Sequence, residues 1–340
     1  MGLWQFIARR LVQSIAVLFF VSVATFTLMH AVPGDPLAAV IGERQADRPE
    51  VRASLEQRYG LNKPLALQYF YYVKSIVVEG DLGTTITTRK PVSEELGRYI
   101  PATIELSAAA MFFALGVGIP LGIVSAIRQD KWQDLFARFL SLVGTAMPVF
   151  WLGLLLTYLV SYKLRWLPRS GYKETGMEEP SSVTGFLSID AIIGGDWAFL
   201  GSYLQHMILP AIVLGSFAMG IVARMLRSSL LAALQDDYVR TARAKGLAEA
   251  SVVRSHALRN AMIPTITVIG LTFASLLAGA VLTETIFSWP GVGQFAVRMA
   301  LKVDYPGLLG VTLFVAVAYI VVNLLVDIAY GFLDPRIRAG

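Results

Sequence analysis

Six long apolar runs constrain this chain more than any other feature of its sequence. The hydrocarbon core of a bilayer takes about 20 helical residues to cross. Inside it, every backbone N–H and C=O must be paired within the protein, which α-helical segments achieve by themselves. The sequence therefore predicts an all-α membrane protein with six transmembrane helices. The predicted spans are residues 11–32, 102–127, 135–162, 207–226, 263–286 and 308–330.

The composition agrees with this interpretation. Hydrophobic residues make up 55% of the 340 positions, charged residues make up 16%, and the mean hydropathy is +0.60. Soluble domains carry about 25% charged residues. The net charge of +5 does not indicate a nucleic-acid partner, because Lys and Arg gather at the ends of the apolar runs and not in one basic patch.

Several kinds of catalytic site are excluded. The chain has no cysteine, so it has no disulfide, thiolate metal site or cysteine nucleophile. His30, His206 and His256 are far apart and form no pair at metal-ligand spacing. No Gly-Lys dipeptide is present, which rules out a Walker A phosphate loop. We therefore predict no catalytic, cofactor or metal site in this chain.

The first apolar run has two interpretations. Trp4, Phe6, Arg9 and Arg10 precede it, and interfacial aromatics with positive charge favour an uncleaved anchor over residues 1–32. A cleaved signal peptide is the alternative. Its apolar region would be about 7 to 15 residues long and would end at a small-x-small site. The longer run here favours the anchor.

A polar insertion, residues 33–101, separates the first two spans. Residues 33–100 carry nine Lys or Arg and nine Asp or Glu, so no positive excess holds the insertion inside and we expect it in the periplasm. Proline and glycine signals predict one helix between Pro49 and Gly60 and a second opened by Pro64. The aromatic cluster at 69–72 either packs this helical insertion or contacts substrate, and we favour packing.

Prolines and aromatics give further local expectations. We expect Pro101 to open the second span, Pro148 to kink the third and Pro264 to open the fifth. Residues 163–203 are rich in Gly, Pro and Ser and predict an irregular loop over the outer face. Trp289 suits a membrane interface.

A polar stretch, residues 236–247, interrupts the apolar second half of the chain. Its small or apolar positions, among them Tyr238, Thr241 and Ala242, recur at helical spacing. Gly246 stands where a helix of about two turns needs a left-handed terminator. We predict a short surface helix in a loop of residues 229–262, where another protein can press on it.

The polar stretch resembles the cytoplasmic loop of permease subunits of binding-protein-dependent ABC importers. Residues 238–246 read YVRTARAKG and residues 258–264 read LRNAMIP, which is similar to the dipeptide and oligopeptide branch of that family. GDLG at 80–83, ETIFSWPGVG at 284–293 and DYP at 304–306 are also similar to the family. The resemblance covers nearly the whole chain.

The resemblance implies the type I importer permease fold, with a permease core over residues 102–332 and a cytoplasmic tail over residues 333–340. It implies the longer, B-type permease, which pairs with a second, different permease. The other implied partners are two ABC ATPase subunits, which bind ATP and Mg, and a periplasmic peptide-binding protein. The implied substrates are dipeptides or short oligopeptides; glutathione, nickel chelates and haem are the alternatives within the family.

Two sets of candidate residues follow. We expect Tyr238, Thr241 and Ala242 to face into a cleft of the ATPase, with Arg240, Arg243 and Lys245 at its rim. The predicted coupling residues are Asp237, Tyr238, Arg240, Thr241, Ala242, Lys245 and Gly246. The candidate pathway residues are Glu105, Glu284 and Asn323.

Structural roles stay open for the pathway candidates. Glu105 suits the first turn of its helix, where an acid complements the helix dipole. Asn323, four residues before Asp327, suits a hydrogen bond to a neighbouring helix. We favour the structural interpretation for Glu105 and for Asn323.

Two other functions compete with the importer permease. An ion-coupled secondary transporter places ionisable residues near the middle of the bilayer, whereas Glu105, Glu284 and Asp327 fall near span ends. An intramembrane hydrolase needs a metal site or a Ser-His pair at membrane depth, and the three histidines stand at loop edges. Both functions are disfavoured.

The arginines predict the orientation of the chain. Those that flank spans fall on one common side, which we take as cytoplasmic. They are Arg9, Arg10, Arg128, Arg224, Arg227, Arg336 and Arg338. We therefore expect a multi-pass protein of the bacterial inner membrane with both termini in the cytoplasm.

Overall fold

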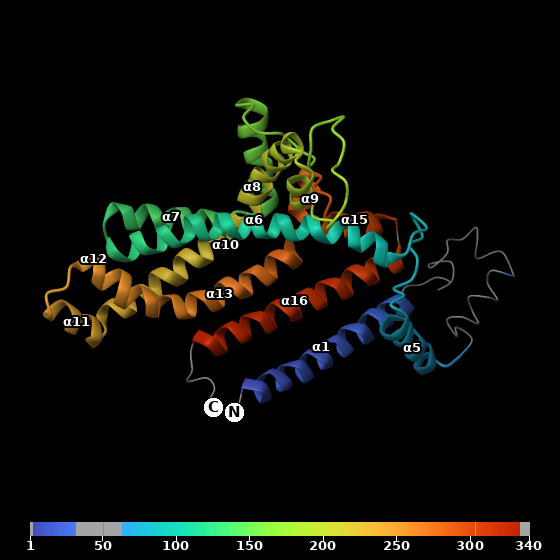
Figure 1. The fold of residues 1–340 in the computed structure, drawn as a ribbon, viewed down its shortest axis with the longest axis horizontal. Coiled ribbons are helices and arrows are strands. Elements are labelled where there is room, and N and C mark those ends of the chain that lie inside the picture. The colour runs from blue at the N-terminus through green and yellow to red at the C-terminus, as the bar shows by residue number, and fades with distance from the viewer. Residues whose placement is uncertain (1–2, 32–49, 51–62, 303, 334–340) are drawn as a thin grey trace.

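The computed structural model describes residues 3–31, 50, 63–302 and 304–333, and in this part the chain is helical apart from turns, loops and one isolated bridge between Thr84 and Pro91 (Figure 1). The α-helices are α1 Leu3–Ala31, α5 Leu65–Lys74, α6 Val92–Ile127, α7 Trp132–Ala146, α8 Val149–Leu156, α9 Leu187–Gly194, α10 Trp197–Gln235, α11 Asp237–Ala244, α12 Glu249–Ser251, α13 Leu258–Gly279, α14 Val281–Phe287, α15 Val292–Leu301 and α16 Tyr305–Leu333. The π-helical turns are η1 Ser75–Glu79, η2 Thr157–Lys163 and η3 Val252–Ala257. The all-α prediction is confirmed.

Among the described residues, four helices are long and apolar enough to cross a membrane, and a fifth span exists if the bent pair of α7 and α8–η2 counts as one. The four are Val92–Ile127, Trp197–Gln235, Glu249–Ala278 and Pro306–Val326. The apolar part of α1, Val12–Thr27, is shorter. The chain is therefore a multi-pass membrane protein, and the count of six spans stays a prediction.

The two longest helices, α6 and α10, form the centre of the molecule and pack against each other along much of their length. Glycine allows this close approach. A Cβ atom on Gly118 of α6 would lie 2.9 Å from the Met219 carbonyl oxygen of α10, and one on Gly220 of α10 would lie 2.5 Å from the Ser141 carbonyl oxygen of α7. Because small residues let membrane helices meet backbone to backbone, α6, α7 and α10 form one tightly packed unit.

Two apolar clusters mark the opposite ends of the long axis (Figure 1). At the end that carries α11 and α12, which we call the α11 end, Ala126, Leu226, Leu230, Val239 and Ala242 belong to one cluster. At the end that carries α5 and α15, which we call the α15 end, Val92, Leu96, Val292, Phe295, Met299 and Val311 form another. Helix α6 contributes to both clusters, with Ala126 at the α11 end and with Val92 and Leu96 at the α15 end.

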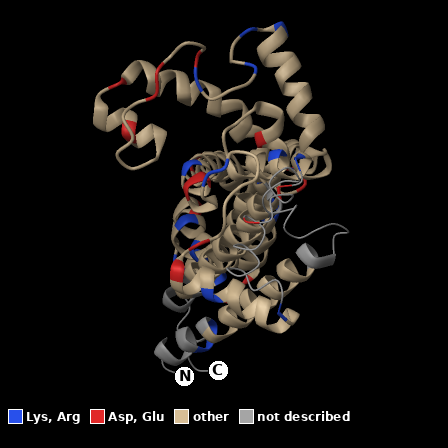
Figure 2. Cartoon of the chain, turned by 90° about the vertical axis from the view of Figure 1, so that its right-hand side faces the viewer, with Lys and Arg blue, Asp and Glu red and all other residues tan. Residues whose placement is uncertain are grey.

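The third predicted span is broken, not merely kinked. The axes of α7 and the α8–η2 segment differ by 107°, and Met147, between them, has an extended backbone with φ −75° and ψ 130°. Pro148 explains this conformation, because a residue before proline avoids the helical region and proline itself donates no hydrogen bond. The segment of α8, η2 and α9 therefore stands out from the bundle as a side arm (Figure 2).

Two prolines do not open helices as predicted. Helix α6 begins at Val92 after Pro91, so Pro101 lies inside it, and α13 begins at Leu258, so Pro264 is also internal. Membrane helices tolerate internal prolines because neighbouring groups satisfy the freed backbone atoms. The proline at the helix start is Pro91, ten positions before the one that the apolar run suggested.

Residues 163–203 are less irregular than predicted. They contain α9 and the first turns of α10, which extends beyond the predicted 207–226 at both ends. Asp196 caps α10 by accepting a hydrogen bond from the Phe199 N–H at 2.9 Å. At the other end Leu230 continues the helix into the apolar cluster. Tertiary burial there outweighs the polar sequence that suggested a stop.

The second predicted helix of the insertion is present, whereas the first, between Pro49 and Gly60, lies outside the described residues. Helix α5 follows Pro64 as expected. Its Tyr69 hydroxyl lies 2.7 Å from the Ser22 hydroxyl of α1, and its ring lies 5.4 Å from the ring of Phe26. These contacts agree with packing as the role of the aromatic cluster.

Candidate functional site

The polar stretch forms α11, which leads out of the bundle after α10 (Figure 1). Gly246 ends it with a left-handed φ of 79°. The Gly246 N–H donates to the Arg243 carbonyl at 2.9 Å, and the Leu247 N–H donates to the Ala242 carbonyl at 3.4 Å. This pair of bonds is a Schellman motif, which satisfies the last carbonyls of a helix. The predicted helix and its glycine terminator are confirmed.

One face of α11 packs on its own chain. Val239 is fully buried and Ala242 is 5% exposed, both in the cluster with Leu226 and Leu230 of α10. Our expectation that Ala242 faces another protein is therefore wrong. The helical periodicity was right, but it left open which face the remainder of the chain would cover. Ala242 holds α11 in place.

The other face of α11 is open. Tyr238 is 37% exposed, and Asp237, Arg240, Thr241 and Lys245 are exposed as well. Arg240 lies 3.3 Å from Asp237 in the preceding turn. The face thus presents one aromatic ring, two hydroxyls, one carboxylate and two cationic side chains. Such a surface suits a partner cleft with an apolar floor and an acidic rim.

Helix α11 is also tied to α12. The Arg243 guanidinium donates to both carboxylate oxygens of Glu249, at 3.1 and 2.7 Å. The two side chains are 42% and 59% exposed. This forked pair closes the loop between the helices at the surface of the molecule.

An ion pair with a buried carboxylate at the α11 end was not foreseen from the sequence. Asp134 of α7 is fully buried, and its carboxylate accepts from the Arg227 guanidinium and from the Ser125 hydroxyl. In the sequence, Arg227 served only as a marker of orientation and Asp134 as the end of a short loop. The one available signal was the i,i+4 spacing of Asp134 and Arg138 at a helix start.

Glu105 joins the side arm to the bundle. It lies well inside α6, not in the first turn as expected, because the helix begins at Val92. Its carboxylate accepts from the Ser188 N–H at 3.0 Å, and also from the Ser188 and Tyr203 hydroxyls. Glu105 therefore has neutral donors from α9 and α10 and is only half-buried.

Glu284, within α14, is fully buried. Its carboxylate accepts from the Thr103 hydroxyl at 2.7 Å and from the Gln294 N–H at 3.0 Å. A Cβ atom on Gly291 would collide with this carboxylate. The close fit explains why the turn after α14 contains glycine at that position.

Trp289, in the turn between α14 and α15, is also fully buried. Its indole N–H donates to the Ala102 carbonyl at 2.9 Å, and its ring lies 5.0 Å from the ring of Tyr203. The expectation that Trp289 lies at the membrane interface is therefore wrong. A tryptophan fits an interface or a core with one polar partner equally well, and the sequence did not distinguish the two.

Asn323 lies on α16 with its side-chain oxygen buried and without a hydrogen-bond partner among the described residues. The side chain of Asp327 lies outside the described part. Glu105 belongs to α6, and Glu284 of α14 accepts a hydrogen bond from Thr103, two residues before Glu105. Asn323 belongs to α16. The structure therefore does not gather the three pathway candidates into one site.

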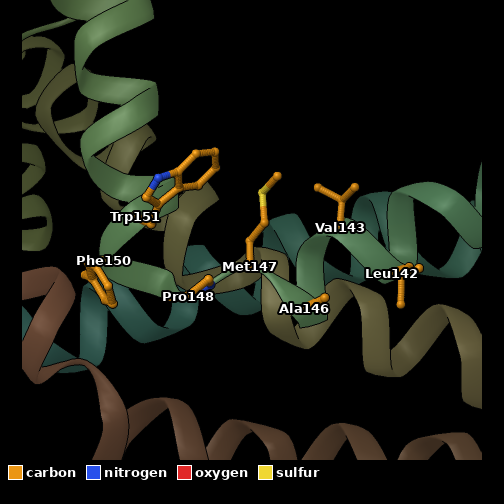
Figure 3. Close-up of a pocket in the computed structure, with 7 residues that line it drawn as sticks. All are labelled: Leu142, Val143, Ala146, Met147, Pro148, Phe150 and Trp151. Atoms are coloured by element: carbon orange, nitrogen blue, oxygen red, sulfur yellow. The ribbon is translucent and has the colours of Figure 1, made fainter.

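The described part of the chain includes an apolar pocket and a polar pocket. One, of about 470 Å³, lies at the bend between α7 and α8 (Figure 3), and the other, of about 660 Å³, lies at the start of α10. The first is apolar and is lined by Leu142, Val143, Ala146, Met147, Pro148, Phe150 and Trp151. The second is polar and includes Lys173, Glu174, Ser202, Gln205 and His206. None of the pathway candidates lines either pocket.

The sequence matches two family models. The one described as binding-protein-dependent transport system inner membrane component matches residues 118–339. The model of the N-terminal part of such membrane components matches residues 3–107. Together they cover the described helices at both ends of the chain.

Curated relatives match over almost their whole length. The dipeptide transport system permease protein DppB of Escherichia coli (strain K12) is 46% identical over 336 residues, which is 98% of each chain. The di/tripeptide transport system permease protein DppB of Pseudomonas aeruginosa (strain UCBPP-PA14) is 47% identical over 335 residues, again 98% of each. The glutathione transport system permease protein GsiC of Salmonella typhimurium is 36% identical over 335 residues, covering 98% of this chain and 99% of that one.

A solved structure supports the fold. A chain of the MetNI methionine ABC transporter in an inward-facing conformation aligns with a TM-score of 0.54 and 13% identity, over 71% of this chain and 97% of that one. At this identity the likeness concerns the fold alone. The helices described above therefore have the arrangement of a type I importer permease.

Proposed function

Because the chain belongs to the family of inner membrane components of binding-protein-dependent transport systems, we propose that it is the permease subunit of an ATP-driven importer of dipeptides or short oligopeptides. The observation that carries the substrate class is the identity of 46% and 47% with two permeases named for dipeptide and di/tripeptide transport. The glutathione permease, at 36%, makes a γ-linked tripeptide the second candidate substrate. Nickel chelates and haem are the other cargoes that we expect within this family.

A permease of this kind works with an ATPase and a binding protein. We propose that ATP and Mg bind only to two separate ATPase subunits and that a periplasmic protein delivers the peptide. We propose further that a second, different permease completes the pathway, so that the peptide crosses at the interface between the two. The chain itself then supplies no catalytic residue, cofactor site or metal site.

We propose that the open face of α11 is the surface on which the ATPase acts. Asp237, Tyr238, Arg240, Thr241 and Lys245 form this face, and all of them are exposed. Ala242 and Gly246 contribute differently, since the first anchors the helix and the second ends it. This assignment keeps the predicted coupling segment and reverses the role of one residue within it.

Thr241→Asp tests the open face. The position is exposed, so the new charge is tolerated by the chain itself but is buried unpaired if an ATPase covers it, at a cost of several kcal/mol. We expect copurification of the ATPase, or its stimulation by loaded binding protein, to be lost. Ala248→Asp is the matched control, because it adds the same charge at an exposed position beyond α11. Equal behaviour of the two variants would contradict the assignment.

The transport function is tested in proteoliposomes that contain the complete complex and a labelled dipeptide. We expect accumulation that requires ATP and the binding protein and that persists in the presence of an uncoupler. Uptake abolished by the uncoupler would favour an ion-coupled transporter. Competition by glutathione and by dipeptides of different sequence would then define the substrate class.

The inner membrane location follows from the family and the apolar helices, and we propose that both termini and the loop at 229–262 face the cytoplasm. Since the chain has no cysteine, Lys90→Cys and Ala248→Cys each introduce a single exposed thiol. We expect an impermeant thiol reagent to label the first in intact spheroplasts and the second only after permeabilisation. Labelling of both from outside would refute this orientation.

A further inference from the structure

The Asp134 carboxylate joins three helices at the α11 end. Arg227 of α10 donates to it through two nitrogens, Nε to Oδ1 and Nη2 to Oδ2, each at 3.0 Å. The Ser125 hydroxyl of α6 donates to Oδ1, and the Asp130 N–H donates to Oδ2 at 3.0 Å. Arg138 approaches the same carboxylate at 3.1 Å from the surface, with 44% of its side chain exposed. The carboxylate itself is fully buried.

Arg224 of α10 also donates to the Thr145 hydroxyl of α7 at 2.7 Å, through one nitrogen and to a neutral acceptor. Away from these side chains, the contact between the two helices is of a different kind. Small residues bring α7 and α10 together, as at Ser141 and Gly220. Apolar surfaces of this type are shallow, and packed helices can slide along each other in small steps. A forked guanidinium–carboxylate pair, in contrast, has a fixed geometry and fixes the axial position of one helix against the other.

The same stretch of α10 carries α11. Leu226 and Leu230, on either side of Arg227 in the sequence, belong to the cluster that buries Val239 and Ala242 of α11. A displacement of α11 therefore acts on α10 within a turn of Arg227. Beyond Asp134, α7 leads directly to the bend at Pro148.

We infer that Asp134 and Arg227 are positioning residues that pass a displacement of α11 from α10 to α7, so that ATP hydrolysis and peptide passage stay in a fixed ratio. The inference rests on the proposed function, because it assumes that an ATPase moves α11. Arg138 is outside this role, since it reaches the carboxylate only from the exposed side.

The test compares variants of the complete complex in proteoliposomes by two readouts, labelled dipeptide taken up and phosphate released. In Asp134→Asn and in Arg227→Gln we expect substrate-stimulated ATP hydrolysis to continue while uptake per ATP falls about tenfold, within the usual range of coupling between sites. Arg138→Gln is the matched control, because it removes the other guanidinium from the same carboxylate. Its ratio should equal that of the wild type.

The double variant Asp134→Asn/Arg227→Gln separates positioning from simple burial of an unpaired charge. Removing both charges relieves the burial cost, so a purely structural role predicts that the double variant regains the wild-type ratio. The positioning role predicts that it stays uncoupled, because neutral amides do not replace the forked ion pair. Recovery of the ratio in the double variant would overturn the inference.

Arg227→Lys covers the case in which a single neutral variant does not assemble. It keeps the charge and one donor but not the fork, and we expect an intermediate ratio of uptake to ATP hydrolysis. A wild-type ratio in Arg227→Lys, or a proportional fall of uptake and hydrolysis in every variant, would contradict the positioning role. Failure of the wild-type complex to accumulate dipeptide would instead contradict the proposed function.

Discussion

The two ends of the molecule hold their helices together with different chemistry. At the α15 end, Glu284 accepts from neutral groups, among them the Thr103 hydroxyl and the Gln294 N–H. Asp304, also fully buried, accepts from the Thr87 N–H at 2.7 Å and the Gly307 N–H at 3.2 Å. At the α11 end, the buried carboxylate of Asp134 faces a guanidinium.

The difference lies in what each carboxylate connects. The backbone N–H donors Gln294 and Gly307 lie in the first turns of α15 and α16, so Glu284 and Asp304 fix the short connections before these helices. The Asp134 pair joins two long helices that lead to α11 and to the side arm. A neutral hydrogen-bond network holds one local geometry, whereas an ion pair between helices sets their relative position. The comparison therefore predicts a rigid α15 end and an α11 end that moves as one body.

The largest expected effect is the loss of the α15-end network in Glu284→Ala. The substitution leaves the Thr103 hydroxyl and the Gln294 N–H without their acceptor and opens a cavity. We expect a loss of about 3 to 5 kcal/mol of folding free energy, from unsatisfied donors and lost packing. The measurement is thermal unfolding of the purified protein in detergent.

Glu94→Ala is the control for this prediction. Glu94 also belongs to α6 at the same end, but its side chain is 59% exposed and pairs with Lys90 at the surface. We expect its thermal unfolding to match that of the wild type. Equal destabilisation by the two substitutions would contradict the distinction between buried and surface carboxylates at this end.

Much of the fold followed from the sequence because its signals are local. Apolar runs predicted the long helices, and Gly246 predicted the end of α11. Proline was less informative. Pro148 breaks a helix and Pro101 does not, because the outcome depends on whether neighbouring helices satisfy the backbone, which a single sequence does not contain.

The site was harder to predict than the fold. The position of the coupling helix was visible in its polar sequence, but the buried face that includes Ala242 was not. The ion pair of Asp134 and Arg227 joins residues that are 93 positions apart. Neither residue stands out locally, since charged residues at span ends are expected for orientation alone. Only the packing of α7 on α10 brings them together.

A smaller effect is expected for Gly291→Ala, which sharpens the same comparison by adding an atom instead of removing a group. The new Cβ collides with the Glu284 carboxylate, and overpacking of a buried site costs about 1 to 3 kcal/mol. Gly97→Ala is the control, since a Cβ there meets nothing within 4 Å. We expect a lower unfolding temperature only for the first variant, and an equal shift for both would contradict the tight fit.

The side arm offers a test by pH. Burial alone raises the pKa of Asp190, but hydrogen bonds from the Thr184 hydroxyl and from the Thr184 and Gly185 N–H groups outweigh it and hold the pKa below its usual range. A depressed carboxyl pKa contributes stability above the unfolded pKa, about 3.9, and this is lost as the pH falls through the folded value.

Asp190→Asn should therefore loosen the start of α9 at pH 7 by about 1 to 2 kcal/mol, because an amide nitrogen cannot accept from these donors. The measurement is amide hydrogen exchange of residues 183–194, corrected for its intrinsic pH dependence. The difference from the wild type should shrink as the pH falls below the ordinary range of Asp. A difference independent of pH would rule out the charge as its cause.

The smallest effect is expected for the exposed ion pair at the α11 end. Arg243 and Glu249 have a forked geometry similar to that of Arg227 and Asp134, but both side chains are exposed, by 42% and 59%. We expect Arg243→Ala to cost less than about 1 kcal/mol, because water and salt screen exposed charges. The measurement is thermal unfolding in low and high salt.

Salt gives this prediction its control. If the pair acts only at the surface, the small difference between Arg243→Ala and the wild type disappears in high salt, since screening removes the same interaction that the substitution removes. In the pair of Asp134 and Arg227 the carboxylate is fully buried and the guanidinium side chain is 22% exposed, so salt screens this pair less and it should keep most of its contribution. A large loss of folding free energy in Arg243→Ala that does not depend on salt would contradict this prediction. It would mean that the pair of Arg243 and Glu249 behaves like the pair of Asp134 and Arg227, and that α11 and α12 are held together as one rigid unit.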